Sequence, residues 1–195
     1  MPLYAALRVH DALYSISRQT GQAYRIGEHN DFGIELNDPR AMMWDGSRLY
    51  MIERETTPSG LAESWSLYLV DQNTGAARAA NVIPQVRGNS PRNRLHEIGT
   101  GVSIVSFTLV GDQVFLLAST QFTATLYRYR IGADGLWTRL GSQSVSARFT
   151  TPRGTPAGGH VYNIAAVGNT FYCNTSLGRA SIPCLLYTSP SPRDS

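Results

Sequence analysis

The chain has 195 residues, of which 42% are apolar and 16% charged, a composition that excludes a polar disordered segment and suffices for one sizeable core. Its formal net charge is +3, but all 17 basic residues are Arg and they form no run and no patch interleaved with aromatic residues, so the charge does not indicate nucleic-acid binding. No stretch approaches the roughly 18 apolar residues of a membrane-spanning helix, and two cysteines, Cys173 and Cys184, are too few for a disulfide framework and lie outside zinc-ligand spacing.

The first predicted elements are three short strands within residues 1–27. The apolar stretch PLYAALRV comes first and has the composition of a strand. It is followed by LYSISRQTG, in which a strand that begins at Leu13 runs into a turn that ends at Gly21. Glycine supplies the positive φ of such a turn without steric cost. A weaker strand, QAYRIG, follows and suits the edge of a sheet.

The same order recurs in residues 40–83, with one strand more at the start. The stretch AMMW leads into DGSRLYMIE, and a tight turn placed between two apolar runs predicts a hairpin. The strand and turn of LYLVDQNTG then end at Gly75, and AARAANV again suits an edge. Asp71 can close this turn by bonding to its own backbone. A calcium loop is not indicated, because Val82 stands where its closing acidic ligand should be.

Residues 103–142 and 161–176 supply the third and fourth copies. The stretches SIVSFTLV and VGDQVFLLA predict another hairpin, LYRYRIGADG ends at Gly135, and LWTRLG follows as an edge strand. YNIAAV and VGNTFYCNT begin a fourth copy. The elements recur with a period of about 54 to 60 residues, and no segment shows the periodicity of an amphipathic helix of useful length.

These repeats predict an all-β fold made of four-stranded antiparallel blades. The runs LYLV, VFLLA and IVSF are almost continuously apolar, so their sheets must be covered on both faces. Repeated sheets covered in this way pack around an axis as a β-propeller. We expect residues 1–183 to form a single incomplete propeller domain of about three blades, an open arc and not a closed ring. The side chains expected in its core are Leu67, Leu69, Ile104, Phe107, Val114 and Leu116.

Two stretches resemble known β-propeller repeats. The segment DPRAMMWDGSRLYMIE, residues 38–53, resembles the Asp-Pro-Arg hairpin of the YWTD family, with Met-Ile-Glu where Trp-Thr-Asp would stand. The segment LYLVDQNTGAA is similar to repeats of quinoprotein-like and NHL-like propellers. The resemblance covers residues 3–175 and does not resolve the family. The quinoprotein repeat has a Trp after its Thr-Gly turn, and here only Trp137 lies nearby, so we expect neither a quinone nor another cofactor.

The last segment, CLLYTSPSPRDS, differs from the rest of the chain in its Ser and Pro content and its lack of a strand period. It matches a translation of the transposon mosaic-end adapter that is used to prepare sequencing libraries, from Cys184 through Asp194. We interpret residues 184–195 as an artefactual, unstructured tail and leave them out of the functional argument. On this interpretation the natural chain is cut near Pro183.

The long connections between blades are the candidate binding region. Residues 27–40, 83–101 and 146–161 exceed the usual loop length of about 4 to 6 residues, and a propeller brings such connections to one face around its channel. Arginine on that face suits carboxylate or phosphate, because its planar fork binds both oxygens of such a group. The predicted binding residues are Arg40, Arg94, His96, Arg153 and His160.

The sequence thus favours a non-enzymatic scaffold that binds a small anionic ligand or a protein partner on the face formed by these connections, with no nucleic acid and no membrane span. The alternative is a propeller enzyme of the lactonase, hydrolase or lyase kind. It requires at least two Asp, Glu, His or Asn side chains that converge at the channel mouth. The four histidines are scattered, so we expect no metal, and no catalytic residue is identified. An export signal upstream of Met1 would place the protein outside the cytoplasm.

Overall fold

The computed structural model describes about two thirds of the chain, and the described residues form strands and turns with no helix among them. They are residues 3–7, 12–27, 32, 38–56, 62–83, 93–95, 98, 101–102, 104–120, 123–145, 161–167, 170–175 and 178–183. The tail 184–195 lies outside them.

The second repeat forms a four-stranded antiparallel sheet whose strands are neighbours in chain order, as predicted. Its strands are β4 (Pro39–Trp44), β5 (Leu49–Thr56), β6 (Ala62–Val70) and β7 (Ala77–Ala79). In the centre of the sheet Met51 is paired with Met42 on one side and with Tyr68 on the other. We call this sheet the second blade.

The third repeat forms a sheet of the same order, the third blade. Its strands are β9 (Ile104–Val110), β10 (Gln113–Ser119), β11 (Ala124–Ile131) and β12 (Trp137–Ser144). A fifth strand, β8 (Val82–Ile83), pairs with β12 in parallel. The predicted edge strand AARAANV is therefore divided: residues 77–79 pair with β6 in the second blade, and residues 82–83 pair with the third blade.

Three-stranded antiparallel sheets precede and follow these two blades. The first blade consists of β1 (Leu3–Leu7), β2 (Ala12–Ile16) and β3 (Ala23–Ile26). The fourth blade consists of β13 (Val161–Val167), β14 (Thr170–Thr175) and β15 (Gly178–Pro183). Strand β15 lies beyond the strands that the sequence pattern predicted, and it takes the position that β2, β6 and β11 hold in the other blades.

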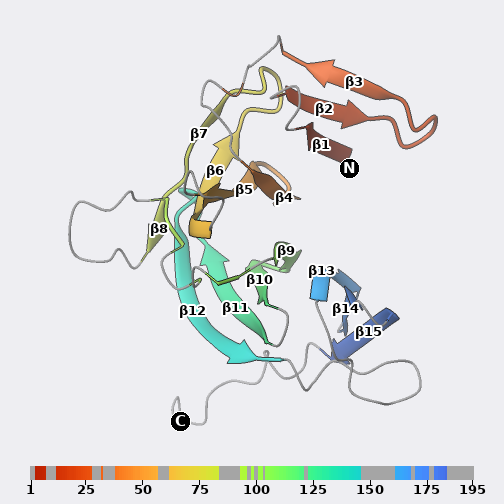
Figure 1. Cartoon of the computed structure of the whole chain (residues 1–195). Helices are drawn as coiled ribbons and strands as arrows, with labels where there is room; N and C mark the ends of the chain where they lie inside the picture. The colour runs from red at the N-terminus through yellow and green to blue at the C-terminus, as the bar shows by residue number, and fades with distance from the viewer. Residues whose placement is uncertain are drawn as a thin grey trace.

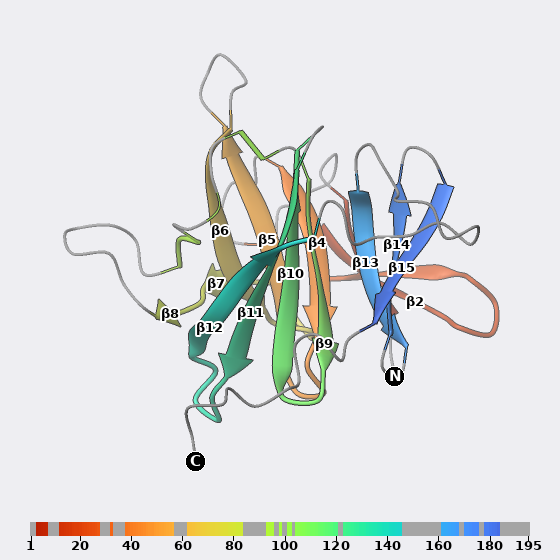
Figure 2. The ribbon, with the colours of Figure 1, turned by 90° about the horizontal axis from the view of Figure 1, so that it is seen from below.

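The four blades follow one another along an arc in chain order, from β1 near the N-terminus to β15 (Figure 1). Strands β4, β9 and β13 lie on the concave side, where β4 contacts β9 and β9 contacts β13. Figure 2 shows the third blade in front of the second, with the strands of the two blades running roughly along the same line. The chain is thus all-β, with an open arc of propeller-type blades, and the predicted fold class is confirmed.

Apolar clusters fill the spaces between consecutive blades. Strand β10 contributes to two of them, because Val114 and Leu116 face the second blade while Phe115 and Leu117 face the fourth. Trp137 is fully buried between the second and third blades, with its ring centroid 5.3 Å from that of Tyr50. The prediction that the central sheets are covered on both faces is therefore confirmed for the second and third blades. Of the six predicted core residues, four are buried, Leu69 is half-buried, and the side chain of Ile104 lies outside the description: the buried four are Leu67, Phe107, Val114 and Leu116.

The three predicted turn glycines all have positive φ, at +70° for Gly21, +82° for Gly75 and +82° for Gly135. The side chain of Asp71 closes the second of these turns by accepting hydrogen bonds from the backbone, as predicted. This local chemistry explains why the strand-and-turn element could be recognised three times in the sequence.

Candidate functional site

The start of β4 and the end of β5 lie together at the end of the second blade that carries the connections between blades. There the carboxylate of Asp38 is shared by two guanidinium groups. Its Oδ2 accepts hydrogen bonds from Nη2 of Arg40 at 2.6 Å and from Nε of Arg54 at 2.8 Å, and Nη2 of Arg54 lies 2.7 Å away. We call Asp38, Arg40 and Arg54 the shared-carboxylate cluster.

Backbone pairing brings these three residues together. The N–H of Arg54 donates to the carbonyl of Asp38 at 3.0 Å, so the pairing of β4 and β5 extends one residue before β4. The pairing of β4 with β5 changes register between Pro39 and Ala41, so Arg40 is an extra, unpaired residue of β4, as in a β-bulge. Such an irregularity redirects a side chain at the edge of a sheet, and here Arg40 bonds to the aspartate two residues before it.

The cluster carries an excess of positive charge. Two guanidinium groups and one carboxylate sum to +1, because Arg is always protonated. The Asp38 side chain is 12% exposed, whereas the Arg40 side chain is 37% exposed. Arg40 uses one N–H on Asp38, and the described residues offer it no second partner. Its remaining donors can therefore bind an anion from solvent.

Glu55 forms a separate cluster on the opposite face of the same sheet. Its carboxylate accepts hydrogen bonds from Ser64 Oγ at 2.5 Å, Ser66 Oγ at 2.7 Å and Arg94 Nη2 at 2.9 Å. Burial alone would raise the pKa of Glu55, but the two hydroxyl groups and the charge of Arg94 outweigh burial and lower it. Glu55 is therefore an ionised anchor for Arg94.

Arg94 is placed by a return of the chain to the outer edge of β6. The N–H of Leu67 donates to the carbonyl of Asn93 at 2.9 Å, and the N–H of Leu95 donates to the carbonyl of Trp65 at 2.8 Å. Residues 93–95 thus cover the half of β6 that β7 does not reach. Leu95 is buried and fixes this segment in the core.

A buried carboxyl and a tyrosine lie next to the Glu55 cluster. Glu53 points to the same face as Glu55, because side chains two residues apart on a strand share a face, and it is only 2% exposed. Burial, together with the nearby charges of Glu53 and Glu55, raises the pKa of Tyr68 to about 12. This hydroxyl stays protonated at neutral pH, so it can donate but cannot serve as a base.

Of the five predicted binding residues, the structure describes Arg40 and Arg94. They lie at the same end of the second blade but on opposite faces: Arg40 lies with Arg54, on the face turned to the third blade, and Arg94 lies with Glu55, on the face turned to the first. The other three lie outside the described residues: His96, Arg153 and His160. Their place relative to Arg40 stays a prediction.

Arg54 was missed by the sequence analysis although it completes the cluster. The available signal was the charged triplet Glu-Arg-Glu at residues 53–55, which lies near the end of a strand that begins with four apolar residues. A charged triplet on a central strand places its middle residue on one face and its outer residues on the other. That rule alone predicts that Arg54 points away from both glutamates.

Among the described residues no three His, Cys, Asp or Glu side chains are grouped so that they could hold a metal ion together. The same residues include no helix that is long and apolar enough to cross a membrane.

Comparison with known proteins gives no family. No protein-family model matches the chain, and no curated protein matches it. Among solved structures, the chain is similar to the computationally designed protein Ika4, with 9% identity over 93% of this chain and 84% of that one and a TM-score of 0.43. It is also similar to the periplasmic gluconolactonase PpgL of Pseudomonas aeruginosa, with 14% identity over 84% of this chain and a TM-score of 0.46. For BamB of Moraxella catarrhalis the identity is 10% over 87% of this chain and 75% of that one, with a TM-score of 0.31.

The matched region spans 42% of the length of PpgL. Likenesses this weak assign neither a family nor an activity to this chain. The assignment as a propeller-type repeat protein rests on the order, pairing and packing of its own strands.

Proposed function

We propose that the protein is a binding propeller that holds an anionic group of a small ligand at the shared-carboxylate cluster. One observation supports this proposal above all: Asp38 neutralises only one of the two guanidinium groups that it holds, and Arg40 is partly exposed. Asp38 also orients both groups, so little side-chain entropy is lost when an anion binds. A guanidinium fork suits either a carboxylate or a phosphate.

Binding is favoured over hydrolysis by the state of the carboxylates at this end of the blade. Asp38 is held by two guanidinium groups, and Glu55 is held by two hydroxyls and a guanidinium with a lowered pKa. The lowered pKa makes Glu55 a weak general base and keeps it from acting as an acid at neutral pH. The enzyme alternative therefore lacks a supporting pair of groups among the described residues of this cluster.

The test is a calorimetric titration with inorganic phosphate. Arg40→Gln removes the exposed guanidinium and keeps a polar side chain, so we expect phosphate affinity to fall about tenfold, the usual scale for one charged hydrogen bond. Arg130→Gln is the matched control, because Arg130 is also paired with an aspartate but lies on the third blade, with its side chain 57% exposed.

The proposal requires that Arg130→Gln bind phosphate within twofold of the unaltered protein. Equal losses of phosphate affinity in the two variants would show that binding depends on net charge alone. An unchanged affinity in Arg40→Gln would show that the cluster is not the phosphate site. Thermal midpoints of both variants verify that each is folded.

A further inference from the structure

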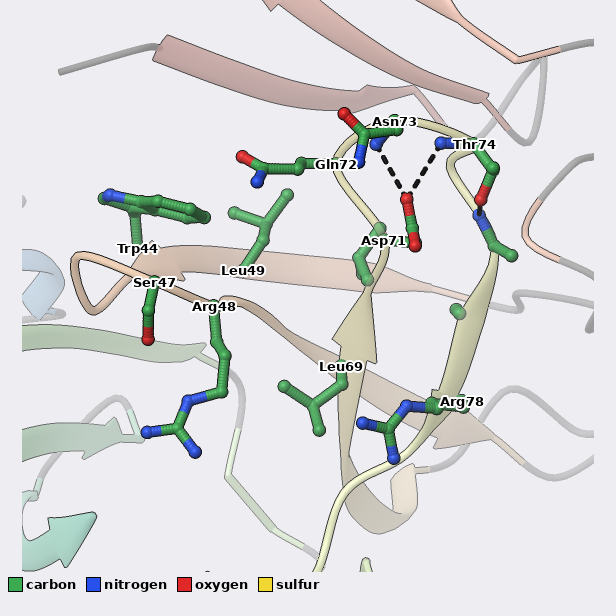
Figure 3. A pocket seen from close by; sticks show the side chains of 13 residues that line it. Trp44, Ser47, Arg48, Leu49, Leu69, Asp71, Gln72, Asn73, Thr74 and Arg78 are labelled. Atoms are coloured by element: carbon green, nitrogen blue, oxygen red, sulfur yellow. Dashed lines mark hydrogen bonds between the residues drawn. The ribbon is translucent and has the colours of Figure 1, made fainter. Parts of the chain in front are cut away.

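Each blade has one face turned to the blade before it in the chain and one face turned to the blade after it. We call these the backward face and the forward face. Residues of a strand alternate between them. In β5, Leu49 and Met51 pack toward the first blade, whereas Tyr50 and Ile52 pack toward the third. Figure 3, a view into a pocket at the edge of the second blade, shows Leu49 on the side where the strands of the first blade lie.

The interface between the third and fourth blades shows which positions of the repeat meet. Phe115 lies on the forward face of β10 and Phe171 on the backward face of β14, and their ring centroids are 4.8 Å apart. In the equivalent stretches DGSRLYMIE, VGDQVFLLA and VGNTFYCNT, Phe115 holds the position of Tyr50, and Phe171 holds that of Leu49. All four side chains are buried. A forward position and a backward position of the repeat therefore cover each other between blades.

The forward face of the fourth blade leaves its equivalent position uncovered. Tyr172 holds the position of Phe115 in the repeat, but its side chain is 49% exposed. Val167 lies on the same face and is 66% exposed, whereas Val110, which holds the same position in the third blade, packs against the fourth blade. This face therefore presents apolar side chains that the next blade covers elsewhere in the chain.

The backward face of the first blade is uncovered in the same way. Leu3 is opposite Ile16 in the pairing of β1 with β2, as Leu49 is opposite Val70 in the pairing of β5 with β6. Leu3 thus holds the backward position of Leu49. Leu49 is buried against the first blade, whereas Leu3 is 48% exposed. Exposed apolar side chains gathered on one face mark an interaction surface.

A second copy of the chain is the partner that fits these two faces. Between consecutive blades, a forward face is covered by a backward face, and the described arc leaves one of each uncovered. The first and fourth blades lie at opposite ends of the arc (Figure 1), so the two faces do not meet within one chain. A second copy offers both matching faces at once.

We infer that two copies of the chain associate head to tail, with the forward face of the fourth blade against the backward face of the first blade in the other copy. Tyr172 then packs against Leu3 of the other copy, as Phe115 packs against Phe171 within one chain. Two chains of four blades close a ring of eight, within the range of about four to eight for closed propellers. The inference goes beyond the proposed function and does not depend on it.

The test is the mass of the 195-residue chain in solution, measured by sedimentation equilibrium over a range of concentrations. We expect the mass of two chains, with a dissociation constant that can be fitted. Tyr172→Asp places an unpaired charge in both contacts of the ring. The dissociation constant should therefore rise about a hundredfold, or about tenfold for each contact. Leu3→Asp should weaken association to a similar extent from the other side of the contact.

Tyr24→Asp is the matched control. Tyr24 is also an exposed tyrosine, at 52%, and it lies on the first blade. It is opposite Ser15 in the pairing of β2 with β3, which places it on the forward face, away from Leu3. The variant adds the same charge and should leave the dissociation constant within twofold. Circular dichroism verifies that every variant is folded.

A paired substitution tests whether Tyr172 and Leu3 meet across the contact. Leu3→Lys and Tyr172→Glu should each weaken association alone, and a chain that carries both should recover part of the affinity, because opposite charges then face each other. The inference is overturned if the unaltered chain is a monomer or if its mass keeps rising beyond two chains. It is also overturned if Tyr24→Asp weakens association as much as Tyr172→Asp, or if the paired substitution recovers nothing.

Discussion

The two ends of the second blade use aspartate and arginine in different ways. At the turn-bearing end the partners of each aspartate lie within three residues of it: Asp45 bonds to the backbone of Ser47 and Arg48, and Asp71 bonds to its own turn. At the loop-bearing end only Arg40 is a near neighbour of its carboxylate, two residues after Asp38, whereas Arg54 lies 16 residues after Asp38 and Arg94 lies 39 residues after Glu55. Local sequence builds the first end, and strand pairing builds the second.

Because of this difference, one end of the blade is held mainly by bonds to the backbone, and the other end carries an excess of positive charge. In the turns, the carboxylates accept hydrogen bonds from backbone N–H groups, and the guanidinium of Arg48 is paired with Asp45, so the turns hold the chain without leaving a cation in excess. At the loop-bearing end, carboxylates are satisfied by side chains, and two arginines share one aspartate. Fixed arginine donors that are only partly neutralised are suited to anion recognition.

The largest expected effect is the loss of Asp38. In Asp38→Ala two guanidinium groups remain close together with no carboxylate between them, and Arg54 is mostly buried. We expect the free energy of unfolding to fall by about 2 to 3 kcal/mol, measured by urea denaturation. Asp112→Ala, which breaks an ion pair of 57% and 67% exposed side chains, should cost less than about 0.5 kcal/mol. Equal costs for the two variants would mean that the cluster is no more than a surface ion pair.

Turns of the same kind in the first and third blades are probed by two glycines at equivalent positions, Gly21 and Gly135. Gly21→Ala should cost about 1 kcal/mol, because φ is +70° and no atom crowds the new methyl group. Gly135→Ala should cost about 1 kcal/mol more, since the added Cβ would lie 2.5 Å from Nη1 of Arg48. In an Arg48→Ala background the two costs should become equal. A difference that persists in this background would show that Arg48 is not its source.

Acid should weaken the loop-bearing end through Glu55. The folded-state pKa of Glu55 lies below its usual value of about 4.3, so the unfolded chain binds the proton more readily. The resulting stabilisation is present above pH 4.3 and is lost as pH falls through the folded-state pKa. Glu55→Gln should therefore show a shallower loss of unfolding free energy below pH 4.3 than the unaltered protein does. Identical slopes in denaturation series across this range would contradict the assigned role.

The smallest expected effect on stability is that of Arg40→Gln. With its side chain 37% exposed, Arg40 should contribute less than about 0.5 kcal/mol to the free energy of unfolding. Its role in phosphate binding would then be separate from any role in folding. A loss above about 1 kcal/mol in urea denaturation would instead make Arg40 a structural residue.

Much of the fold could be predicted from the sequence because its turns are local. Gly75 and Gly135 supply positive φ, Asp71 closes its own turn, and each such turn marks the end of a strand. Strand β15 was not predicted, because its sequence GRASIP has no apolar run and no Gly-containing turn motif stands after it in the sequence. Its pairing with β14 defines it, and pairing partners are not visible in a single segment.

The candidate site could be predicted only in part, for the same physical reason. The rule that arginine in a long connection suits an anion predicted Arg40 and Arg94 as binding residues. Their separation onto two faces of the sheet depends on the register of β4, β5 and β6. Register also brings Arg54 to Asp38. A single-residue change of register would exchange the faces of Arg54 and Glu55, and no local motif fixes that choice.

Binding of an oxyanion by the shared-carboxylate cluster is the property on which the proposed function depends. It is measured most directly by anomalous diffraction from a crystal soaked in selenate, a tetrahedral oxyanion. The account predicts an anomalous peak within hydrogen-bond distance of Arg40 in the unaltered protein and its loss in Arg40→Gln crystals. Selenate bound at other exposed arginines, with no peak beside Arg40 and with Arg40 free of crystal contacts, would contradict it.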